Sequence, residues 1–434
     1  MPRVTTSEGI SKAGWKIVLL ASLGGTLEFY DFVVFGVFAR DIAEAVFPNS
    51  TPIVSLMASF GAFAAGYLAR PIGGLVLSHY GDRYGRRRVF LLSLFVMSAA
   101  TLGMGLVPSH AAWGAWATFT MVVLRLIQGF CIGGELPGAL TYVVETAPRR
   151  YAPFVCGLVF ACVTLGVAVA SAVSVGVRTF LPPDQVSTYG WRIAFVLGGL
   201  SGLLSVLMRR AMEESPEFAR MKALAVKRPF GEVLRTHRAE VLVGIAGLAA
   251  TGGFNGLFFA LMPAYLSTVL QYSARDAVTA QTIGVVVHAA SILAVGQLAD
   301  RVSPRLMIGV GASLLILLAF PFYSVLGTRA IGLVPAMLIA AVIAGLVNGT
   351  FAVLLTDLFP TQIRFTGVAL VFNIAFTLFS GTAPFVATTL IRELAMPTAP
   401  ALVMIGCGLL TVAAAFGLGR RGGHVLEAPA SRPG

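Results

Sequence analysis

The sequence has few charged residues for its length. Only 12% of its 434 residues are Asp, Glu, Lys or Arg, whereas about a quarter is usual in a soluble globular protein. Hydrophobic residues make up 57% of the chain, and its mean hydropathy is +0.86. This composition excludes an ordinary soluble domain and predicts a protein whose main solvent is lipid.

The chain also lacks the patterns that build metal sites, disulfide frameworks and catalytic centres. Its four cysteines are Cys131, Cys156, Cys162 and Cys407, all in apolar runs. Because their spacing fits neither a metal site nor a disulfide framework, we interpret them as packing residues. No HExxH, GxSxG or P-loop pattern occurs. We therefore expect no enzyme, no resident cofactor and no metal, and ATP-driven transport would require a partner subunit.

Apolar runs of about 20 residues, the length that crosses the hydrocarbon core of a bilayer, recur along nearly the whole chain. The first run is too long for a cleavable signal peptide. Twelve transmembrane helices are predicted at 15–38, 54–78, 89–108, 115–138, 152–177, 191–208, 240–266, 279–299, 306–327, 331–355, 366–391 and 399–419.

A polar insert at about 209–238 divides these runs into six and six, and its charge spacing suits a helix at the membrane surface. The expected fold class is an all-α polytopic membrane protein. Its predicted parts are an N-terminal six-helix bundle (1–208), a cytoplasmic linker with a surface helix (209–238), a C-terminal six-helix bundle (239–420) and a short cytoplasmic tail (421–434).

Basic residues are distributed unequally between the two sides of this predicted topology. The net charge is +12. If both termini are cytoplasmic, only six of the 31 Lys and Arg residues lie on outward connections: Arg40, Arg178, Arg192, Arg275, Arg329 and Arg392. This bias follows the positive-inside rule, so we expect cytoplasmic termini and an inner-membrane location. Because the basic residues form no continuous face, nucleic acid is not an expected partner.

The two halves of the chain repeat each other. HYGDRYGRRR (79–88), between the second and third runs, matches GQLADRVSPR (296–305), between the eighth and ninth. ETAPRR (145–150) likewise matches DLFPTQIR (357–364), and each has an acid three residues before a proline. Parallel half-repeats are typical of transporters whose substrate site lies between two bundles.

These features resemble the major facilitator superfamily. More specifically, they resemble its metabolite:proton symporter branch. This branch includes ketoglutarate, citrate, shikimate and proline/betaine carriers. The motifs that carry this likeness are EFYDF (28–32), LARPIGG (68–74) leading into GDRYGRRR, RLIQGFCIGGELPGALTYVVE (125–145) and ESPEF (214–218). One departure is Pro137, where related sequences generally have a small residue, and we expect a kink there.

Glu28 and Asp31 interrupt the first apolar run. A charge at the centre of a lone span costs roughly 2.5–3.5 kcal/mol, so such residues usually face water or another charge. The i, i+3 spacing places both acids on one helix face. Because two close carboxylates cannot both ionise cheaply, we predict a proton-coupling site. The alternative is that one acid neutralises an arginine of the fourth helix.

Arg125, on the fourth helix, offers a fork of donors that matches a carboxylate. It is expected either to bind the carboxylate of a small organic acid or to be a structural partner of the two acids in the first helix. The other predicted substrate contacts are Tyr30, Arg70, Gln128 and Asn255. Glu135 is expected either to relay protons inwards or to join the inner charge network.

In the second half, the polar residues inside the runs are neutral or weakly basic. They are Asn255, His288, Asn348 and Asn373. Asn255 lies at a suitable depth for a substrate contact, and His288 is interpreted as a hydrogen-bonded packing residue rather than a titrating one.

The repeated loop charges are interpreted, from the family resemblance, as a cytoplasmic gate that latches the bundles while the cavity opens outward. Its predicted members are Asp82, Arg83, Gly85, Arg86, Glu145, Arg149, Asp300, Arg301, Asp357 and Arg364. The alternative is a set of solvated loops, which explains the arginines but not the repeated acids.

The expected function is secondary active transport. A small organic acid would be carried together with protons by a monomer that works by rocker-switch alternating access. One alternative is a proline or betaine carrier, whose zwitterionic substrates would also need an anionic partner in the cavity. Another is a membrane sensor of the same fold that transports nothing.

Overall fold

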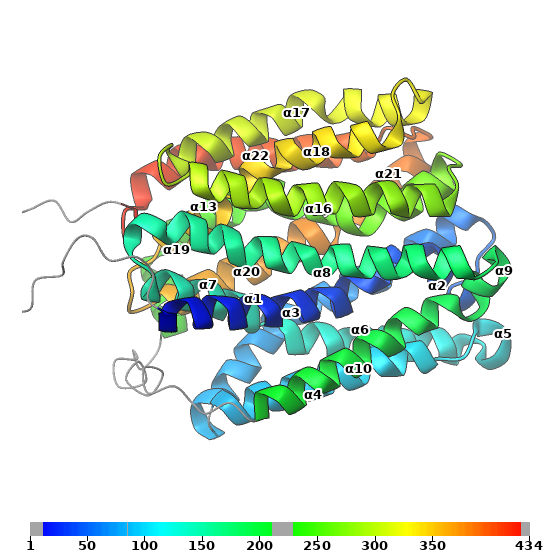
Figure 1. Cartoon of the computed structure of the whole chain (residues 1–434), viewed down its shortest axis with the longest axis horizontal. Helices are drawn as coiled ribbons and strands as arrows, with labels where there is room; N and C mark the ends of the chain where they lie inside the picture. The colour runs from blue at the N-terminus through cyan, green and yellow to red at the C-terminus, as the bar shows by residue number, and fades with distance from the viewer. Residues whose placement is uncertain (1–11, 85, 211–228, 427–434) are drawn as a thin grey trace, which may run out of the picture.

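The structure is a computed structural model that describes residues 12–84, 86–210 and 229–426 (Figure 1). Long helices run side by side along the molecule, and no β-strand occurs within these ranges. The first described helix begins, and the last one ends, at the left of Figure 1. We call this side of the molecule the terminal end and the other side the opposite end.

The N-terminal bundle comprises six crossings of the molecule and their connections. Its elements are α1 (Lys12–Val37), α2 (Ala39–Val46), α3 (Pro52–Tyr84), α4 (Arg86–Leu106), α5 (His110–Trp113), α6 (Ala115–Ile132), α7 (Glu135–Thr146), η1 (Arg149–Tyr151), α8 (Ala152–Phe180), α9 (Pro183–Gln185), η2 (Val186–Gly190) and α10 (Trp191–Arg210).

The C-terminal bundle has the same plan with more interruptions. Its elements are α12 (Pro229–Thr236), α13 (Arg238–Gly247), α14 (Ala249–Phe254), η3 (Asn255–Leu261), α15 (Met262–Ala264), η4 (Tyr265–Val269), α16 (Ala274–Leu298), α17 (Pro304–Thr328), α18 (Leu333–Asn348), α19 (Phe351–Asp357), α20 (Arg364–Ala375), η5 (Phe376–Gly381), α21 (Ala383–Leu394) and α22 (Pro400–Arg421).

Consecutive elements that continue one another form a single crossing, as α6 and α7 do. Counted this way, the twelve predicted runs correspond to twelve helical crossings. Among the described residues, nine crossings are long and apolar enough to span a bilayer. The remaining three, α1, α4 and α10, pack within the N-terminal bundle. The predicted all-helical, twelve-crossing fold is therefore confirmed.

The polar insert contributes one described helix. Residues 211–228 lie outside the described ranges, and α12 follows them. Val233 on α12 is buried, and α12 packs against α13 and α20. An amphipathic helix thus lies where a surface helix was expected, held on the C-terminal bundle.

The fourth crossing breaks at Gly133 and Gly134, between α6 and α7. Proline has no amide hydrogen, so Pro137 cannot donate to the carbonyl of Gly133, four residues earlier. The helix is thus interrupted one turn before the proline at which a kink was expected. The seventh and eleventh crossings are also irregular, because they contain the π-helical segments η3 and η5. Such segments occur often at functional sites.

Glycines allow the helices to approach closely. A Cβ on Gly129 of α6 would overlap the carbonyl oxygen of Gly66 in α3. At the terminal end, a Cβ on Gly157 of α8 would lie 3.3 Å from the Cα of Gly296 in α16. At the opposite end, a Cβ on Gly36 would lie 2.8 Å from the Cβ of Ala260. The two bundles thus touch at both ends of the molecule.

Candidate functional site

Two buried guanidinium groups, Arg70 on α3 and Arg125 on α6, lie against one aromatic ring. Their Cζ atoms are 5.5 Å and 4.1 Å from the ring centroid of Phe32. Further rings surround the pair: Phe35, Phe63, Tyr67 and Phe372. Cation–π contact stabilises a desolvated guanidinium, but it leaves the N–H groups to be satisfied.

Arg125 is oriented by neutral acceptors. Its Nη2 donates to the backbone carbonyl of Phe32 at 3.0 Å, and its Nη1 donates to Oε1 of Gln128. Gln128 in turn donates to the carbonyl of Asp31 at 2.9 Å and to Oγ1 of Thr101 at 2.8 Å. These bonds hold the guanidinium plane in one position, as a bidentate anion site requires.

Neither arginine has an acidic partner among the described residues. Nε of Arg125 and both Nε and Nη1 of Arg70 are buried without a hydrogen-bond acceptor. Desolvating an unpaired charge costs several kcal/mol. The two cations therefore form a site that an anionic group could complete.

Asp31 does not pair with Arg125 in this conformation. Its carboxyl lies against α10, where a Cβ on Gly198 would be 2.5 Å from Oδ1 and a Cβ on Gly202 would be 3.2 Å from Oδ2. Both carboxyl oxygens are buried without a donor. The suggested bridge between an acid of the first helix and the arginine of the fourth is thus not formed by Asp31.

The other acids of the predicted proton site are less completely defined. Glu28 is buried, and its Oε1 has no hydrogen-bond partner. The side chain of Glu135 lies outside the described part of the chain. Tyr30, a predicted substrate contact, donates its hydroxyl to the carbonyl of Ala194 at 2.9 Å, so this group ties α1 to α10.

In the C-terminal bundle, a buried neutral network joins three crossings. Nδ2 of Asn348 donates to Oδ1 of Asn255 at 2.9 Å and contacts Nε2 of His288 at 2.8 Å. Nδ1 of His288 contacts the carbonyl of Ala341 at 2.8 Å. With the proton on Nδ1, His288 is neutral and accepts from Asn348, as its packing interpretation requires. Nδ2 of Asn255 and Oδ1 of Asn348 remain without partners.

Two of the predicted gate residues join the bundles at the terminal end. Nη1 of Arg364, at the start of α20, lies 3.1 Å from Oε1 of Glu145, at the end of α7. Nε of Arg364 also donates to the carbonyls of Thr356 and Phe359. Arg364 is therefore fixed in its own bundle while it holds the other.

Asp300 makes a second contact between the bundles. Its carboxyl accepts a hydrogen bond from the backbone N–H of Phe154, in the first turn of α8, and it lies near Arg150 and Arg301. A helix N-terminus favours a negative charge. Burial nevertheless raises the pKa of Asp300, and its Oδ1 has no donor.

Among the described residues, Asp357 contacts only its own half. Its carboxylate accepts backbone N–H groups of Gly423, Val425 and Leu426 at 2.7–2.9 Å, and Arg305 lies 3.6 Å away. All of these partners belong to the C-terminal half. The expectation that Asp357 latches the two bundles is therefore corrected: this acid anchors the segment that follows α22.

Of the remaining predicted gate residues, Arg149 and Arg301 are exposed. Gly85 and the side chains of Asp82, Arg83 and Arg86 lie outside the described part of the chain.

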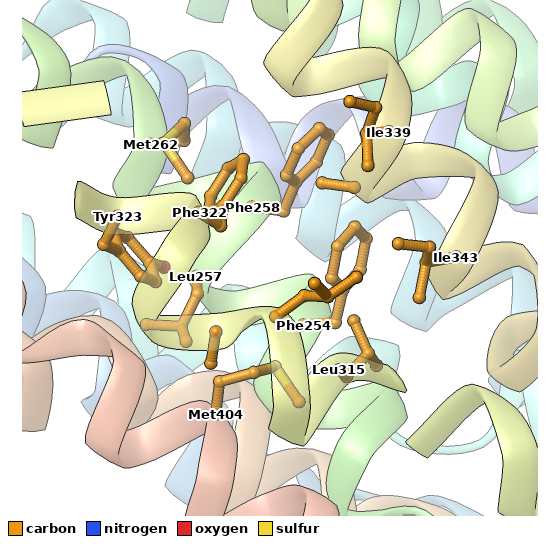
Figure 2. Close-up of a pocket in the computed structure, with 13 residues that line it drawn as sticks. Phe254, Leu257, Phe258, Met262, Leu315, Phe322, Tyr323, Ile339, Ile343 and Met404 are labelled. Carbon is orange, nitrogen blue, oxygen red and sulfur yellow. The ribbon is translucent and has the colours of Figure 1, made fainter. Parts of the chain in front are cut away.

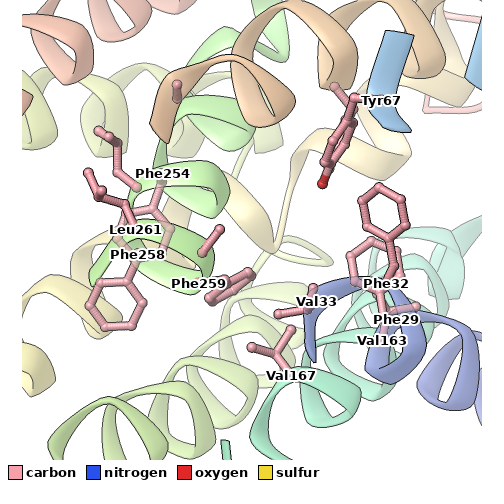
Figure 3. Close-up of a cluster of buried hydrophobic side chains, with 14 of the residues drawn as sticks. Phe29, Phe32, Val33, Tyr67, Val163, Val167, Phe254, Phe258, Phe259 and Leu261 are labelled. Atoms are coloured by element: carbon pink, nitrogen blue, oxygen red, sulfur yellow. The ribbon is translucent and has the colours of Figure 1, made fainter. Parts of the chain in front are cut away.

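Aromatic and aliphatic side chains from both bundles belong to one buried cluster (Figure 3). Phe29 and Phe32 of α1 and Tyr67 of α3 lie on one side, and Phe254 and Phe259 lie on the other. Any compound carried between the bundles would therefore meet aromatic faces as well as the buried cations.

A separate apolar cavity of about 60 Å³ lies within the C-terminal bundle (Figure 2). Phe254, Phe258, Met262, Tyr323 and Met404 are among its lining residues. Its surface offers almost no hydrogen-bonding group, so it is unsuited to a charged substrate. Within the described ranges, no three His, Cys, Asp or Glu side chains gather closely enough to hold a metal.

Sequence reasoning missed two kinds of contact. Arg178, assigned only to an outward connection, forms a nearly buried ion pair with Asp41 that ties α8 to α2. Thr377 and Asn373 bind backbone carbonyls of the N-terminal bundle. The carbonyls belong to Gly133 and Tyr67. Pro137 and Pro71, each four residues later in the sequence, could have indicated that these carbonyls need another donor.

Comparison with known proteins places the whole chain in context. The family model described as Major Facilitator Superfamily matches residues 22–384. The proline/betaine transporter of Salmonella typhimurium is 32% identical over 412 residues, which cover 91% of this chain and 82% of the relative. The glycine betaine/proline/ectoine/pipecolic acid transporter of Dickeya dadantii is 31% identical with the same coverage.

Solved structures agree on the fold. The proton:xylose symporter bound to 6-bromo-6-deoxy-D-glucose has a TM-score of 0.75 and 18% identity, covering 95% of this chain and 96% of that one. An inward-facing bacterial homologue of the lysosomal transporter Spinster has a TM-score of 0.64 and 19% identity, covering 97% and 100%. At these identities the likeness concerns the fold alone.

Proposed function

Since the chain belongs to the major facilitator superfamily, we propose that it is a proton-coupled symporter of a small zwitterion, such as proline or a betaine. The names of its relatives support such a compound over the plain organic acid expected from the sequence. The observation that carries the proposal is the pair of buried arginines, which have no acidic partner among the described side chains.

The substrate carboxylate binds between Arg70 and Arg125. Nε of Arg125 and Nε and Nη1 of Arg70, which have no acceptor, can donate to it, and a carboxylate would neutralise part of the buried charge. Aromatic faces then receive the cationic end of the substrate, because a quaternary or secondary ammonium is attracted to a ring face. The rings of Phe29, Tyr67 and Phe259 lie in the buried cluster that both bundles share (Figure 3).

Asp31 is proposed as the main proton carrier, with Glu28 beside it. A carboxyl group that is buried without a donor is stable only when it carries a proton. When the adjacent helices separate and water enters, solvation lowers the free energy of the ionised form, and the proton leaves. Proton and substrate movement are coupled if the bundles change conformation only when both are bound or when neither is bound.

Alternating access is proposed to exchange contacts at the two ends. Glu145 with Arg364, and Asp300 with the start of α8, close the terminal end in the conformation described. We assign this end to the cytoplasm, because the basic loops lie there. Each chain contains both bundles, the two buried arginines and the neutral network of Asn255, His288 and Asn348. We therefore propose that it works as a monomer in the inner membrane.

A carboxylate without a cationic group remains the second candidate substrate, because the two arginines would serve it equally. Purified protein in proteoliposomes separates the two. We expect an imposed inward proton gradient to stimulate uptake of radiolabelled proline or glycine betaine, and citrate, ketoglutarate and shikimate to compete weakly. Stimulated uptake of the organic acids alone would favour the second candidate, and no effect of the gradient on any transported compound would exclude symport.

A further inference from the structure

Two prolines of the N-terminal bundle leave a backbone carbonyl without its helical donor. Pro71 lies inside α3, four residues after Tyr67, and Pro137 lies in α7, four residues after Gly133. Proline has no N–H to give. In a membrane interior an unpaired carbonyl costs several kcal/mol, so each must find another donor.

Both donors come from the other bundle. Oγ1 of Thr377 donates to the carbonyl of Tyr67 at 2.8 Å, and Nδ2 of Asn373 donates to the carbonyl of Gly133 at 2.6 Å. Thr377 and Asn373 are four residues apart on the crossing formed by α20 and η5, so they share one face. All four residues are buried.

The surrounding glycines make room for these bonds. A Cβ on Gly74 would lie 3.1 Å from the carbonyl oxygen of Gly133 and 3.4 Å from Nδ2 of Asn373. A Cβ on Gly381 would overlap the ring of Tyr67. The LARPIGG segment thus supplies both the proline that frees an acceptor and the glycine that lets the eleventh crossing approach.

A third proline provides a contrast within the same molecule. Pro263 of the seventh crossing leaves the carbonyl of Phe259 without its helical donor, and Nε2 of Gln281 donates to it at 2.9 Å. Gln281 lies on α16 of the same bundle. This freed carbonyl is thus satisfied within its own bundle, whereas those of Tyr67 and Gly133 are satisfied across the interface.

We propose that Asn373 and Thr377 are positioning residues that hold the closed terminal end through these two proline-freed carbonyls. The carbonyls have no alternative donor in their own helices, so the bundles can part only when water or substrate replaces the two side chains. Opening is thereby tied to the entry of water between the bundles. The inference rests on the alternating access of the proposed function but not on the identity of the substrate.

The test measures the distance between two spin labels at the terminal end, one on each bundle, in purified protein whose native cysteines are replaced. Asn373→Ala leaves the carbonyl of Gly133 unpaired in the closed state. We expect it to raise the ratio of open to closed conformers about three- to tenfold, the effect of one hydrogen bond.

Pro137→Ala gives that carbonyl an N–H from its own helix. In this background we expect Asn373→Ala to change the ratio by less than about twofold, because the acceptor is already satisfied. Thr377→Val with Pro71→Ala is an independent second pair, should the first variants fold poorly. Gln281→Ala is the matched control, and it should lower thermal stability without changing the label distance.

Equal shifts by Asn373→Ala in the native and Pro137→Ala backgrounds would overturn the proposal, as would unchanged distances in both pairs. Because the readout is a distance, a failure here is separable from a failure of the proposed symport. Label distances that respond as expected, in a protein that transports none of the tested compounds, would retain this inference and reject that function.

Discussion

The two bundles share one six-helix plan, but the polar side chains buried at their centres differ. The N-terminal bundle holds Asp31, Arg70 and Arg125, whose charged groups form no ion pair with one another. The C-terminal bundle holds Asn255, His288 and Asn348, which are neutral and bonded to one another. The two halves therefore have the same helical plan but different buried polar groups.

This difference suggests separate roles for the two bundles in transport. Unpaired charges are costly, so their environment changes most when a proton or a charged substrate arrives. Neutral groups that are hydrogen-bonded to one another respond less to either event, although Nδ2 of Asn255 and Oδ1 of Asn348 have no partner among the described residues. We infer that the N-terminal bundle responds to proton and carboxylate, while the C-terminal bundle supplies a steadier surface. The following predictions test that division.

The largest effect is expected for Arg125→Lys. An ammonium keeps the charge but not the fork that contacts Phe32 and Gln128, so charge-assisted hydrogen bonds are lost and uptake at low substrate should fall roughly 100-fold. Initial rates in proteoliposomes measure this. A rate within about twofold of the native protein would remove Arg125 from the substrate site.

Asp31→Asn should uncouple transport from the proton. One proton per substrate gives roughly tenfold accumulation for one pH unit, and this accumulation should disappear because the amide cannot titrate. Exchange of internal for external substrate should persist. The measurement compares gradient-driven uptake with exchange in the same vesicles, and full accumulation in the variant would exclude Asp31 as the carrier.

Asn348→Ala tests the neutral bundle. It leaves Oδ1 of Asn255 and Nε2 of His288 without a donor, so stability should fall by about 1–3 kcal/mol. Thermal unfolding in detergent measures this loss. Proton coupling of the remaining transport should be intact, and a variant that loses coupling as Asp31→Asn does would break the proposed division between bundles.

Glu145→Gln should weaken the terminal end by a smaller amount. Arg364 is buried and Glu145 is partly buried, but Gln keeps an oxygen acceptor for Nη1 of Arg364, so about 1 kcal/mol should be lost and the open conformers should increase about fivefold. Spin-label distances check this. Arg364→Gln should have the larger effect, because that side chain also holds two carbonyls of its own bundle.

The smallest effect concerns pH at Asp300. Burial raises the pKa of this carboxyl in the closed form, so the closed form binds its proton more readily than an open form that exposes it. Lowering the pH through the titration range should therefore favour closure, and raising it should favour opening. Arg150 and Arg301 and the N–H of Phe154 oppose the shift. Asp300→Asn should abolish this dependence of the label distance on pH.

Much of the fold could be predicted from residue patterns. Twelve apolar runs, the midpoint insert and the repeated loops predicted two six-helix bundles, because a bilayer requires long apolar helices and admits few alternatives. A kink at Pro137 was expected from the missing amide hydrogen, and the helix is interrupted one turn earlier. Polar candidates such as Arg125 and Asn255 stood out because their types are rare within apolar runs.

Partners inside the site could not be predicted in the same way. A pairing of Asp31 or Glu28 with the arginine of the fourth helix was one of two alternatives, and the carboxyl of Asp31 lies against Gly198 of α10. Asp357 was expected at the gate, yet it binds the segment after α22. Both outcomes concern which neighbour a side chain meets, and helical periodicity defines a face without identifying the helix opposite it.

The order of residues was thus enough for the membrane class, the number of crossings, the half-repeat and the rare polar positions, because each depends on local hydropathy and spacing. Packing between the bundles determined which carboxyls remain unpaired, which loop acid bridges the halves and which side chains complete the carbonyls freed by Pro71 and Pro137. Those outcomes arise from contacts between segments as much as 310 residues apart, which no local pattern encodes.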